Sequence, residues 1–525
     1  MDNQHMFELT IPQVVDLAAE RFGGSVAVVD GDVRLSFEDV RGLSVRLAKH
    51  LLKLGIRKGD RVAVQLPNSW HYPILHFALT RIGAILTPLN LAYRQQELRY
   101  MLKHNEVKMV AVVASWHGVN HLALVQEVLA EVETVRHVVV LGEVPVSEQA
   151  IRLESLLREE ADGVSDAQLA VQAPALDDPF AILFTSGTQS DPKATVHTYR
   201  TFVPVHLYQA REYRFSADDV LLTLGSFNHM FSIPMMFSAL HTGIRHIMLT
   251  AFSPAAFLEV AAAEGVTVGL GVPAQWLDIL RVAKDQGVQQ ALRLVVTGGS
   301  KIPPHMVHNL RAQFGCMVAA QWGMTEVCAG AYTRPDDPPE KSWETIGRAC
   351  PEGEMKVLNV LSEEAERGEV GELAFRGPSL FCEYYKNEAA TASAFTKDGF
   401  FLTGDLGWMD EPGFVHFVGR AKDTINRGGL KIYALEIEDM LLEHPAIRQV
   451  AIVRMLDERL GERACAFVEL TEGSSLTLEQ MTEFLTSKGI AKYKLPERLE
   501  IRNGLPMTAS GKVQKAKLMA ELDAS

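Results

Sequence analysis

The sequence has few of the features that mark disulfide-rich, zinc-binding or membrane proteins. Its 525 residues include five cysteines, which lie far apart and form no Cys-x-x-Cys pair. Neither a disulfide framework nor a zinc site is predicted, and a reducing compartment fits this usage. No stretch approaches the roughly 18 uninterrupted apolar residues of a membrane span, and the amino terminus lacks signal-peptide character. We expect a cytoplasmic protein without stable membrane insertion.

The sequence also lacks an excess of positive charge. Its 51 basic and 65 acidic residues give a net charge of −14, with both signs interspersed along the chain. A protein that binds nucleic acid would show a basic patch or a basic total, so no nucleic-acid partner is expected. The 47% hydrophobic and 22% charged residues are ordinary for a globular protein and exclude wholesale disorder. At about 150 residues per domain, the length predicts more than one domain.

Short β-rich runs alternate with helical patterns through much of the chain. Residues 61–66, 107–113 and 292–299 are apolar on both faces of the expected strands, whereas residues 36–55 have the period of an amphipathic helix. This alternation predicts an α/β fold with layers around mostly parallel sheets. The polar stretch 161–179 is predicted to be a surface loop.

The pattern of predicted strands and helices changes in the last third of the chain. Residues 355–420 carry closely spaced short strands and turns, which are typical of a small antiparallel sheet or barrel. A charged, glycine-containing connection follows, and the remaining residues have strands and helices of their own. Their number is sufficient for a small α+β domain.

Two segments that follow apolar runs offer groups suited to a nucleotide. The run 184–198, FTSGTQSDPKATVHT, combines backbone N–H groups, hydroxyls and a lysine that could face phosphate oxygens, although it is not a Walker A loop. The run 321–327, QWGMTEV, places an aromatic, a glycine, a hydroxyl and a carboxylate at a strand end, where open α/β sheets bind ligands. A polar turn and a solvated cap are the simpler interpretations.

Three later segments are also ambiguous when each is taken alone. Asp405 lies in a Thr-Gly-Asp turn and could accept ribose hydroxyls, or could bond to its own backbone. Gly428 and Gly429 permit either a hairpin turn or the close approach of another chain. Lys512 follows Ser-Gly near the carboxyl terminus and could belong to a basic surface helix.

Taken together, in this order and at these spacings, the five segments resemble the adenylate-forming (AMP-binding) superfamily of acyl-CoA and aryl-CoA synthetases and adenylation domains. The resemblance runs from about residue 10 to about residue 520. It implies a large N-terminal adenylation domain over residues 1–421, made of layered α/β sheets and a small β-barrel-like subdomain. It also implies a small mobile α+β C-terminal domain over residues 422–525.

The resemblance implies an activity and a role for each matching residue. Members activate a carboxylic acid with Mg·ATP to an acyl-adenylate, release pyrophosphate, and pass the acyl group to a thiol. Thr325 would contact the α-phosphate, Glu326 would bind Mg²⁺, and Lys512 would bridge the acid and the α-phosphate as the catalytic lysine. The ATP and AMP site would comprise Thr185, Ser186, Gly187, Thr188, Lys193, Gly298, Gly299, Ser300, Gln321, Trp322, Gly323, Met324, Thr325, Asp405 and Arg420.

The remaining expected roles concern the acyl group and the thiol. Lys422 falls at the hinge position, and Gly428 and Gly429 would line the thiol tunnel. The acyl pocket would be apolar and adaptable, which favours a small to medium hydrophobic or ring acid over an amino acid. Its lining would comprise His229, Met230, Phe231, Met235, Val272 and Met324.

The phosphate loop departs from the family pattern at three positions. Gln189 replaces a threonine, Ser190 a glycine and Ala194 the last glycine. Three hypotheses stay open, two of which concern the thiol acceptor and one the altered loop. The protein could be a ligase that uses CoA as the thiol, or an acyl-AMP ligase that loads the phosphopantetheine arm of a separate carrier protein, for example with an aryl acid. It could also be a nucleotide-binding or regulatory protein that has lost turnover.

Overall fold

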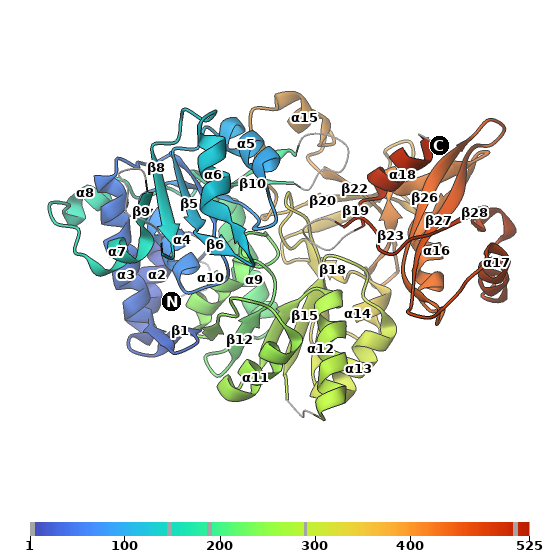
Figure 1. Cartoon of the computed structure of the whole chain (residues 1–525), viewed down its shortest axis with the longest axis horizontal. Helices are drawn as coiled ribbons and strands as arrows, with labels where there is room; N and C mark the ends of the chain where they lie inside the picture. The colour runs from blue at the N-terminus through green and yellow to red at the C-terminus, as the bar shows by residue number, and fades with distance from the viewer. Residues whose placement is uncertain (1–5, 144–149, 186–191, 288–290, 508–512, 524–525) are drawn as a thin grey trace. The chain divides into compact units, whose positions relative to one another are not determined.

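The computed structural model describes residues 6–143, 150–185, 192–287, 291–507 and 513–523 (Figure 1). The predictions for Ser186, Gly187, Thr188, Gln189, Ser190 and Lys512 therefore concern positions outside the described residues. The chain divides into two compact units. The first contains Met1–Thr185, Lys193–Glu354 and Arg376–Ser393, and the second contains Met355–Phe375 and Ala394–Ser525.

The first unit contains a nine-stranded sheet whose central strands are parallel. Its strands, in spatial order, are β18 (Arg348–Ala349), β17 (Ala331–Tyr332), β16 (Met317–Trp322), β15 (Leu294–Gly298), β14 (Val268–Gly271), β12 (Val220–Thr223), β13 (Arg245–Ile247), β1 (Val26–Asp30) and β2 (Val33–Ser36).

A second, eight-stranded sheet belongs to the same unit. Its strands, in spatial order, are β21 (Glu383–Tyr384), β11 (Ala194–Thr198), β10 (Pro179–Phe184), β4 (Ile85–Pro88), β3 (Arg61–Gln65), β5 (Met109–Val113), β8 (His137–Leu141) and β9 (Ala150–Arg152). A short hairpin pairs β6 (Ser115–Trp116) with β7 (Val119–Asn120).

Helices cover both sheets, and local sequence signals set their ends. The longest, α3, begins after Ser36, whose hydroxyl accepts a hydrogen bond from the backbone N–H of Asp39. Helices α10 to α13 each end at a glycine with left-handed backbone. The helices are α2 (Ile11–Phe22), α3 (Phe37–Lys53), α4 (His71–Arg81), α5 (Gln95–His104), α6 (His121–Leu129), α7 (Leu153–Arg158), α8 (Asp166–Ala170), α9 (Tyr199–Glu212), α10 (Ile233–Thr242), α11 (Pro254–Glu264), α12 (Pro273–Gln286), α13 (Pro304–Phe314), α14 (Lys341–Glu344) and α15 (Glu388–Ser393).

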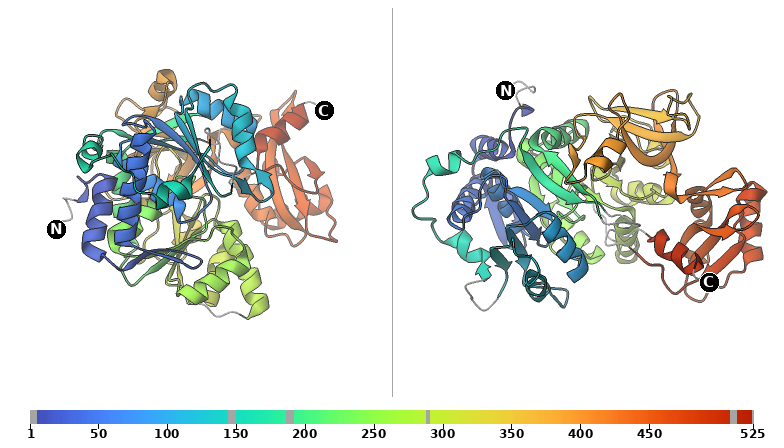
Figure 2. Two further views of the ribbon diagram at one scale, coloured as in Figure 1. Left: turned by 60° about the vertical axis from the view of Figure 1, so that its left-hand side comes forward. Right: turned by 90° about the horizontal axis from the view of Figure 1, so that it is seen from above.

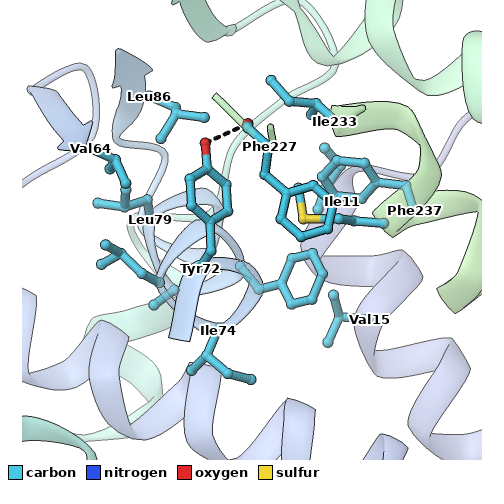
Figure 3. Close-up of a cluster of buried hydrophobic side chains, with 14 of the residues drawn as sticks. Ile11, Val15, Val64, Tyr72, Ile74, Leu79, Leu86, Phe227, Ile233 and Phe237 are labelled. Carbon is cyan, nitrogen blue, oxygen red and sulfur yellow. Dashed lines mark hydrogen bonds between the residues drawn. The ribbon is translucent and has the colours of Figure 1, made fainter. Parts of the chain in front are cut away.

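The largest hydrophobic cluster of the first unit joins strands β3 and β4 to helices α2, α4 and α10 (Figure 3). Within it, Tyr72 of α4 donates a hydrogen bond from its hydroxyl to the Phe227 carbonyl oxygen at 2.7 Å. On the other face of the eight-stranded sheet, residues such as Val110 and Val112 pack beside α5 and α6. The sheet is thus buried on both faces, which confirms the predicted layered α/β class.

The second unit contains two smaller sheets. Residues 355–420, predicted to form a small antiparallel sheet or barrel, contribute a four-stranded sheet with the order β19 (Glu354–Leu358), β20 (Gly371–Arg376), β22 (Phe401–Met409) and β23 (Val415–Arg420). A five-stranded sheet follows, built from β24 (Thr424–Arg427), β25 (Leu430–Tyr433), β26 (Ile447–Asp457), β27 (Gly461–Leu470) and β28 (Arg498–Ile501).

Helices lie on both faces of the five-stranded sheet (Figures 1 and 2). Val450 and Ile452 of β26 face α16 (Ala434–Leu441) and α17 (Leu478–Ser487), whereas Ala451 and Val453 face α18 (Lys515–Asp523). The alternation follows from the period of two in a strand. The small α+β domain predicted from the sequence is therefore confirmed.

One local prediction was wrong. The stretch 161–179, predicted as a loop, contains the short helix α8. Ser165 caps it by accepting a hydrogen bond from the backbone N–H of Gln168. None of its residues is buried, so the helix leaves no apolar period in the sequence.

Candidate active site

Four loops leave the nine-stranded sheet at the same edge. Strands β12, β14, β15 and β16 are neighbours and run parallel. Their carboxyl ends therefore meet, which is where open α/β sheets bind ligands. The loops that follow contain the predicted acyl pocket after β12 and β14, the predicted adenine border after β15, and the predicted α-phosphate contact after β16.

Glycines let the loops after β14, β15 and β16 approach one another. A Cβ atom on Gly298 would lie only 2.0 Å from the carbonyl oxygen of Gln321. Gly299 has a φ of +81°, which side chains rarely adopt, and Val272 lies beside it. Gly299 and Ser300 are exposed. The structure thus brings these sequence-predicted residues together at one edge of the sheet, with Gly298 and Gln321 buried beneath the exposed Gly299 and Ser300.

Two buried residues end strand β16. The side-chain oxygen of Gln321 accepts hydrogen bonds from Gln209 at 2.9 Å and from the Tyr213 hydroxyl at 3.1 Å. The ring of Trp322 packs beside Gly330 and is only 7% exposed. Stacking of adenine on Trp322 stays a prediction.

The turn after β16 is closed by backbone contacts. The N–H of Cys328 donates to the Met324 carbonyl oxygen at 2.8 Å. A Cβ atom on Gly323 would lie 1.7 Å from the carbonyl oxygen of Cys328, so a glycine is required there. Thr325 and Glu326 are half-buried on this turn. Both residues are therefore accessible to a ligand, and the turn that carries them is held by its own backbone contacts.

Three groups from distant parts of the chain hold the Thr325–Glu326 pair. His197 Nε2 donates a hydrogen bond to the Thr325 carbonyl oxygen at 2.7 Å. The N–H of Phe381 donates to the Glu326 carbonyl oxygen at 2.8 Å, and the Tyr384 hydroxyl donates to Glu326 Oε1 at 2.9 Å. Burial, followed by the Glu326 charge, raises the pKa of Tyr384, so its hydroxyl stays a donor.

Neither His197 nor Tyr384 was predicted from the sequence. The two residues lie on the neighbouring strands β11 and β21, which pair through Thr195 and Tyr384. The ammonium of Lys193 also lies 4.6 Å from the centre of the Tyr384 ring. The available signal for His197 was a histidine within an apolar run beside the predicted phosphate loop, but its partner Thr325 is 128 residues away.

Strands β10 and β11 form the antiparallel pair that carries the predicted phosphate loop. The N–H of Thr185 donates to the Lys193 carbonyl oxygen at 2.8 Å and so closes the base of this loop. Ala194, one of the three departures from the family pattern, opens β11 and pairs with Phe184. An alanine fits this strand position without strain.

The predicted acyl pocket residues are only partly accessible. His229 is exposed, and its Nδ1 accepts a hydrogen bond from the Phe231 N–H at 3.2 Å. Phe231, Val272 and Met324 are half-buried. Met230 and Met235 are buried, and Met230 belongs to the hydrophobic cluster that contains Tyr72 and Phe227. Contact of this set with an acid stays a prediction.

In the second unit, Asp405 and Arg420 face each other across β22 and β23. They form an ion pair at 3.3 Å, and Asp405 is 4% exposed. Lys422 lies in a one-turn helix between β23 and β24, where partial burial and then the Arg420 charge lower its pKa. Gly428 and Gly429 form the two-residue turn between β24 and β25, both with positive φ.

The described residues contain no cluster of three or more His, Cys, Asp or Glu side chains that could hold a metal ion. One half-buried carboxylate, such as Glu326, fits a Mg²⁺ ion that takes its other ligands from phosphate oxygens and water.

Comparison with known protein families decides the classification. The sequence model of the AMP-binding enzyme family matches residues 15–385, and that of the AMP-binding enzyme C-terminal domain matches residues 436–512. The chain belongs to the AMP-binding enzyme family. The family resemblance inferred from the five segments is confirmed, and this AMP-binding enzyme is an AMP-forming acid–thiol ligase.

Similar proteins span nearly the whole AMP-binding enzyme. A salicylyl-CoA synthase / salicylate adenylyltransferase from Streptomyces sp is 35% identical over 95% of this chain and 91% of its own length. A 2,3-dihydroxybenzoate-AMP ligase from Bacillus subtilis (strain 168) is 31% identical over 95% of this chain and 91% of its own. ATP-bound MatB from Rhodopseudomonas palustris is 27% identical, with a TM-score of 0.87 over 98% of this chain and 100% of its own.

The described part of the AMP-binding enzyme holds no helix with the length and apolar character of a membrane span.

Proposed function

We propose that the enzyme uses Mg·ATP to activate a small to medium hydrophobic or ring carboxylic acid, and then transfers the acyl group to CoA. The observation that carries this proposal is the Thr325–Glu326 turn. It lies at the carboxyl edge of four parallel strands and is held in place by His197, Phe381 and Tyr384. Two of the relatives named above have ring acids, salicylate and 2,3-dihydroxybenzoate, in their names, and they support the substrate class.

Adenylation brings two anions together, so cations and N–H donors must face the phosphates. We assign this role to Lys193 and Lys512, with Thr325 as the contact of the α-phosphate. Glu326 would hold Mg²⁺, which neutralises phosphate charge when bound. Lys512 would act while negative charge builds between the acid and the α-phosphate.

The nucleotide would be recognised by groups that the sequence already suggests. Asp405, oriented by its ion pair with Arg420, would accept the ribose hydroxyls. Trp322 and the Gly298–Ser300 turn would border adenine. We propose a domain boundary at residues 421 and 422, with Lys422 as the hinge, because Lys422 lies in the short connection between two sheets.

The second candidate acceptor is the phosphopantetheine thiol of a separate carrier protein. The likeness to a 2,3-dihydroxybenzoate-AMP ligase favours it. The ordinary strand geometry of Ala194 weakens the third hypothesis, in which the altered phosphate loop abolishes turnover.

The test is pyrophosphate release with Mg·ATP over a panel of aliphatic, alicyclic and aromatic acids, with and without CoA. We expect release that depends on one class of acid and that CoA accelerates. Acid-dependent release without any effect of CoA would favour the carrier protein. If no acid of the panel causes pyrophosphate release although the enzyme still binds ATP, the proposed function is contradicted.

A further inference from the structure

His197 is a buried histidine with a defined environment on both sides of its ring. Its side chain has no exposed surface, and Nε2 lies 2.7 Å from the Thr325 carbonyl oxygen. A carbonyl can only accept, so Nε2 carries the hydrogen and Nδ1 is left as an acceptor. The Thr201 hydroxyl lies 3.2 Å from Nδ1 and 3.2 Å from the Thr198 carbonyl oxygen, so these two acceptors share its single hydrogen. Burial lowers the pKa of His197 to about 4, which keeps the ring neutral at pH 7.

Burial alone does not explain this arrangement. His76 and His206 are equally buried, and the nitrogens of both rings have no hydrogen-bond partner. Their rings pack against Phe237 instead. His197 differs because it fixes one particular carbonyl group, that of Thr325. Its ring also lies beside Cys328, with Sγ 3.9 Å from Nδ1, so it contacts two positions of the same turn.

The carbonyl that His197 holds belongs to the peptide between Thr325 and Glu326. This peptide is planar, so a rotation of its carbonyl would change the direction of both side chains. The next carbonyl, that of Glu326, is held by Phe381. Two successive peptide groups are therefore fixed by groups outside the turn, and one of the two anchors is a side chain that mutation can remove.

We propose that His197 is a positioning residue for adenylation. Its Nε2–H fixes the Thr325–Glu326 peptide so that the Thr325 hydroxyl and the Glu326 carboxylate both point toward the phosphates of ATP. This inference rests on the proposed function, because it takes the roles of Thr325 and Glu326 from there.

Two variants separate the hydrogen bond from the volume of the ring. His197→Phe keeps a ring but cannot donate, whereas His197→Gln places an amide nitrogen near the position of Nε2. We expect His197→Phe to lower kcat of ATP–pyrophosphate exchange by about 10-fold or more, because small misplacements of reacting groups cost up to about 100-fold. His197→Gln should restore kcat to within about threefold of the wild type, because it restores the donor.

A second readout is thioester formation from a presynthesised acyl-adenylate. It should fall less than exchange in His197→Phe, because pyrophosphate has already left. The matched control is His76→Phe, which replaces an equally buried histidine whose ring holds no backbone group. Its exchange rate should stay within about threefold of the wild type, since no hydrogen bond is lost. Thermal melting of each variant shows whether it is folded.

Four results would overturn the inference while the wild type exchanges pyrophosphate normally. The first is an unchanged exchange rate in His197→Phe. The second and third are a loss of exchange in His197→Gln, or in His76→Phe, as large as that in His197→Phe. The fourth is an equal loss of exchange and of thioester formation in His197→Phe. If His197→Phe does not fold, His197→Asn replaces it, because its shorter amide reaches toward Thr201 and not toward the Thr325 carbonyl. Equal rates in the Gln and Asn variants would then overturn the inference. A wild-type enzyme without acid-dependent exchange would instead contradict the proposed function.

Discussion

At position 323 any side chain larger than hydrogen would meet backbone rather than a flexible side chain. The Cβ atom of Gly323→Ala would lie 1.7 Å from the Cys328 carbonyl oxygen. The turn that carries Thr325 and Glu326 must then open. We expect a loss of stability of about 1–3 kcal/mol, typical of overpacking, and a loss of ATP–pyrophosphate exchange. Denaturant unfolding and the exchange assay measure the two effects.

The control for this variant is Gly42→Ala. Gly42 lies within helix α3, is exposed, and has no atom within 4 Å of a Cβ at its position. Because alanine is the better helix former, stability should rise by about 0.5–1 kcal/mol with unchanged activity. Normal exchange in Gly323→Ala would show that the close approach to Cys328 does not constrain the turn.

Lys512 is a second single residue with a specific proposed role, because its ammonium group would serve only the adenylation half-reaction. Lys512→Ala should remove most adenylation, since the charge that builds between the acid and the α-phosphate loses its cation. Thioester formation from a presynthesised acyl-adenylate should remain largely intact. Pyrophosphate exchange and thioester formation are measured separately on the same preparation, and an equal loss of both would remove Lys512 from its assigned role.

At the scale of elements, strand β21 links Lys193, at the end of the predicted phosphate loop, to the proposed metal ligand Glu326. The Tyr384 hydroxyl holds Glu326, and the face of its ring lies under the Lys193 ammonium. Tyr384→Phe removes the first contact and keeps the second. Groups that hold a metal ligand typically contribute 10–100-fold to affinity, so we expect Mg·ATP to bind about 10-fold more weakly or worse. Calorimetric titration with ATP, with and without Mg²⁺, measures this difference.

Tyr385→Phe is the neighbouring control, because the ring of Tyr385 packs beside His104 and not beside Glu326. It should bind Mg·ATP like the wild type. The same weakening in Tyr384→Phe for ATP without Mg²⁺ would show that the hydroxyl supports the nucleotide site in general and not the metal ligand.

Helices and strands could be predicted from the sequence where their pattern is local. The runs that became β5, β15 and α3 were predicted because their apolar period is local. Thr325 and Glu326 were candidates because they follow a strand. The contact of His197 could not be predicted, since its partner Thr325 lies 128 residues away in the turn after β16. The place of Tyr384 could not be predicted either, since it depends on the pairing of β11 with β21, almost two hundred residues apart. Helix α8 was missed because it buries nothing.

At the scale of the whole molecule, buried histidines make stability depend on pH. Burial lowers the pKa of His76 and His246 to about 3 and that of His197 to about 4. In the unfolded chain these side chains have a pKa near 6.5. Between pH 6.5 and pH 4 the unfolded chain therefore binds protons that the folded chain does not. The free energy of unfolding should fall as pH decreases through this window, by up to about 1.4 kcal/mol per pH unit for each histidine.

His76 offers the sharpest test, because its ring stacks on Phe180 and its nitrogens have no hydrogen-bond partner. His76→Phe removes one titrating group and leaves an aromatic ring in its place. The apparent melting temperature, measured at one scan rate from pH 7 to pH 5, should therefore fall less steeply than in the wild type. Exposed His305→Gln should leave the wild-type slope unchanged. An unchanged slope in His76→Phe would mean that this histidine is protonated in the folded state, in conflict with its burial.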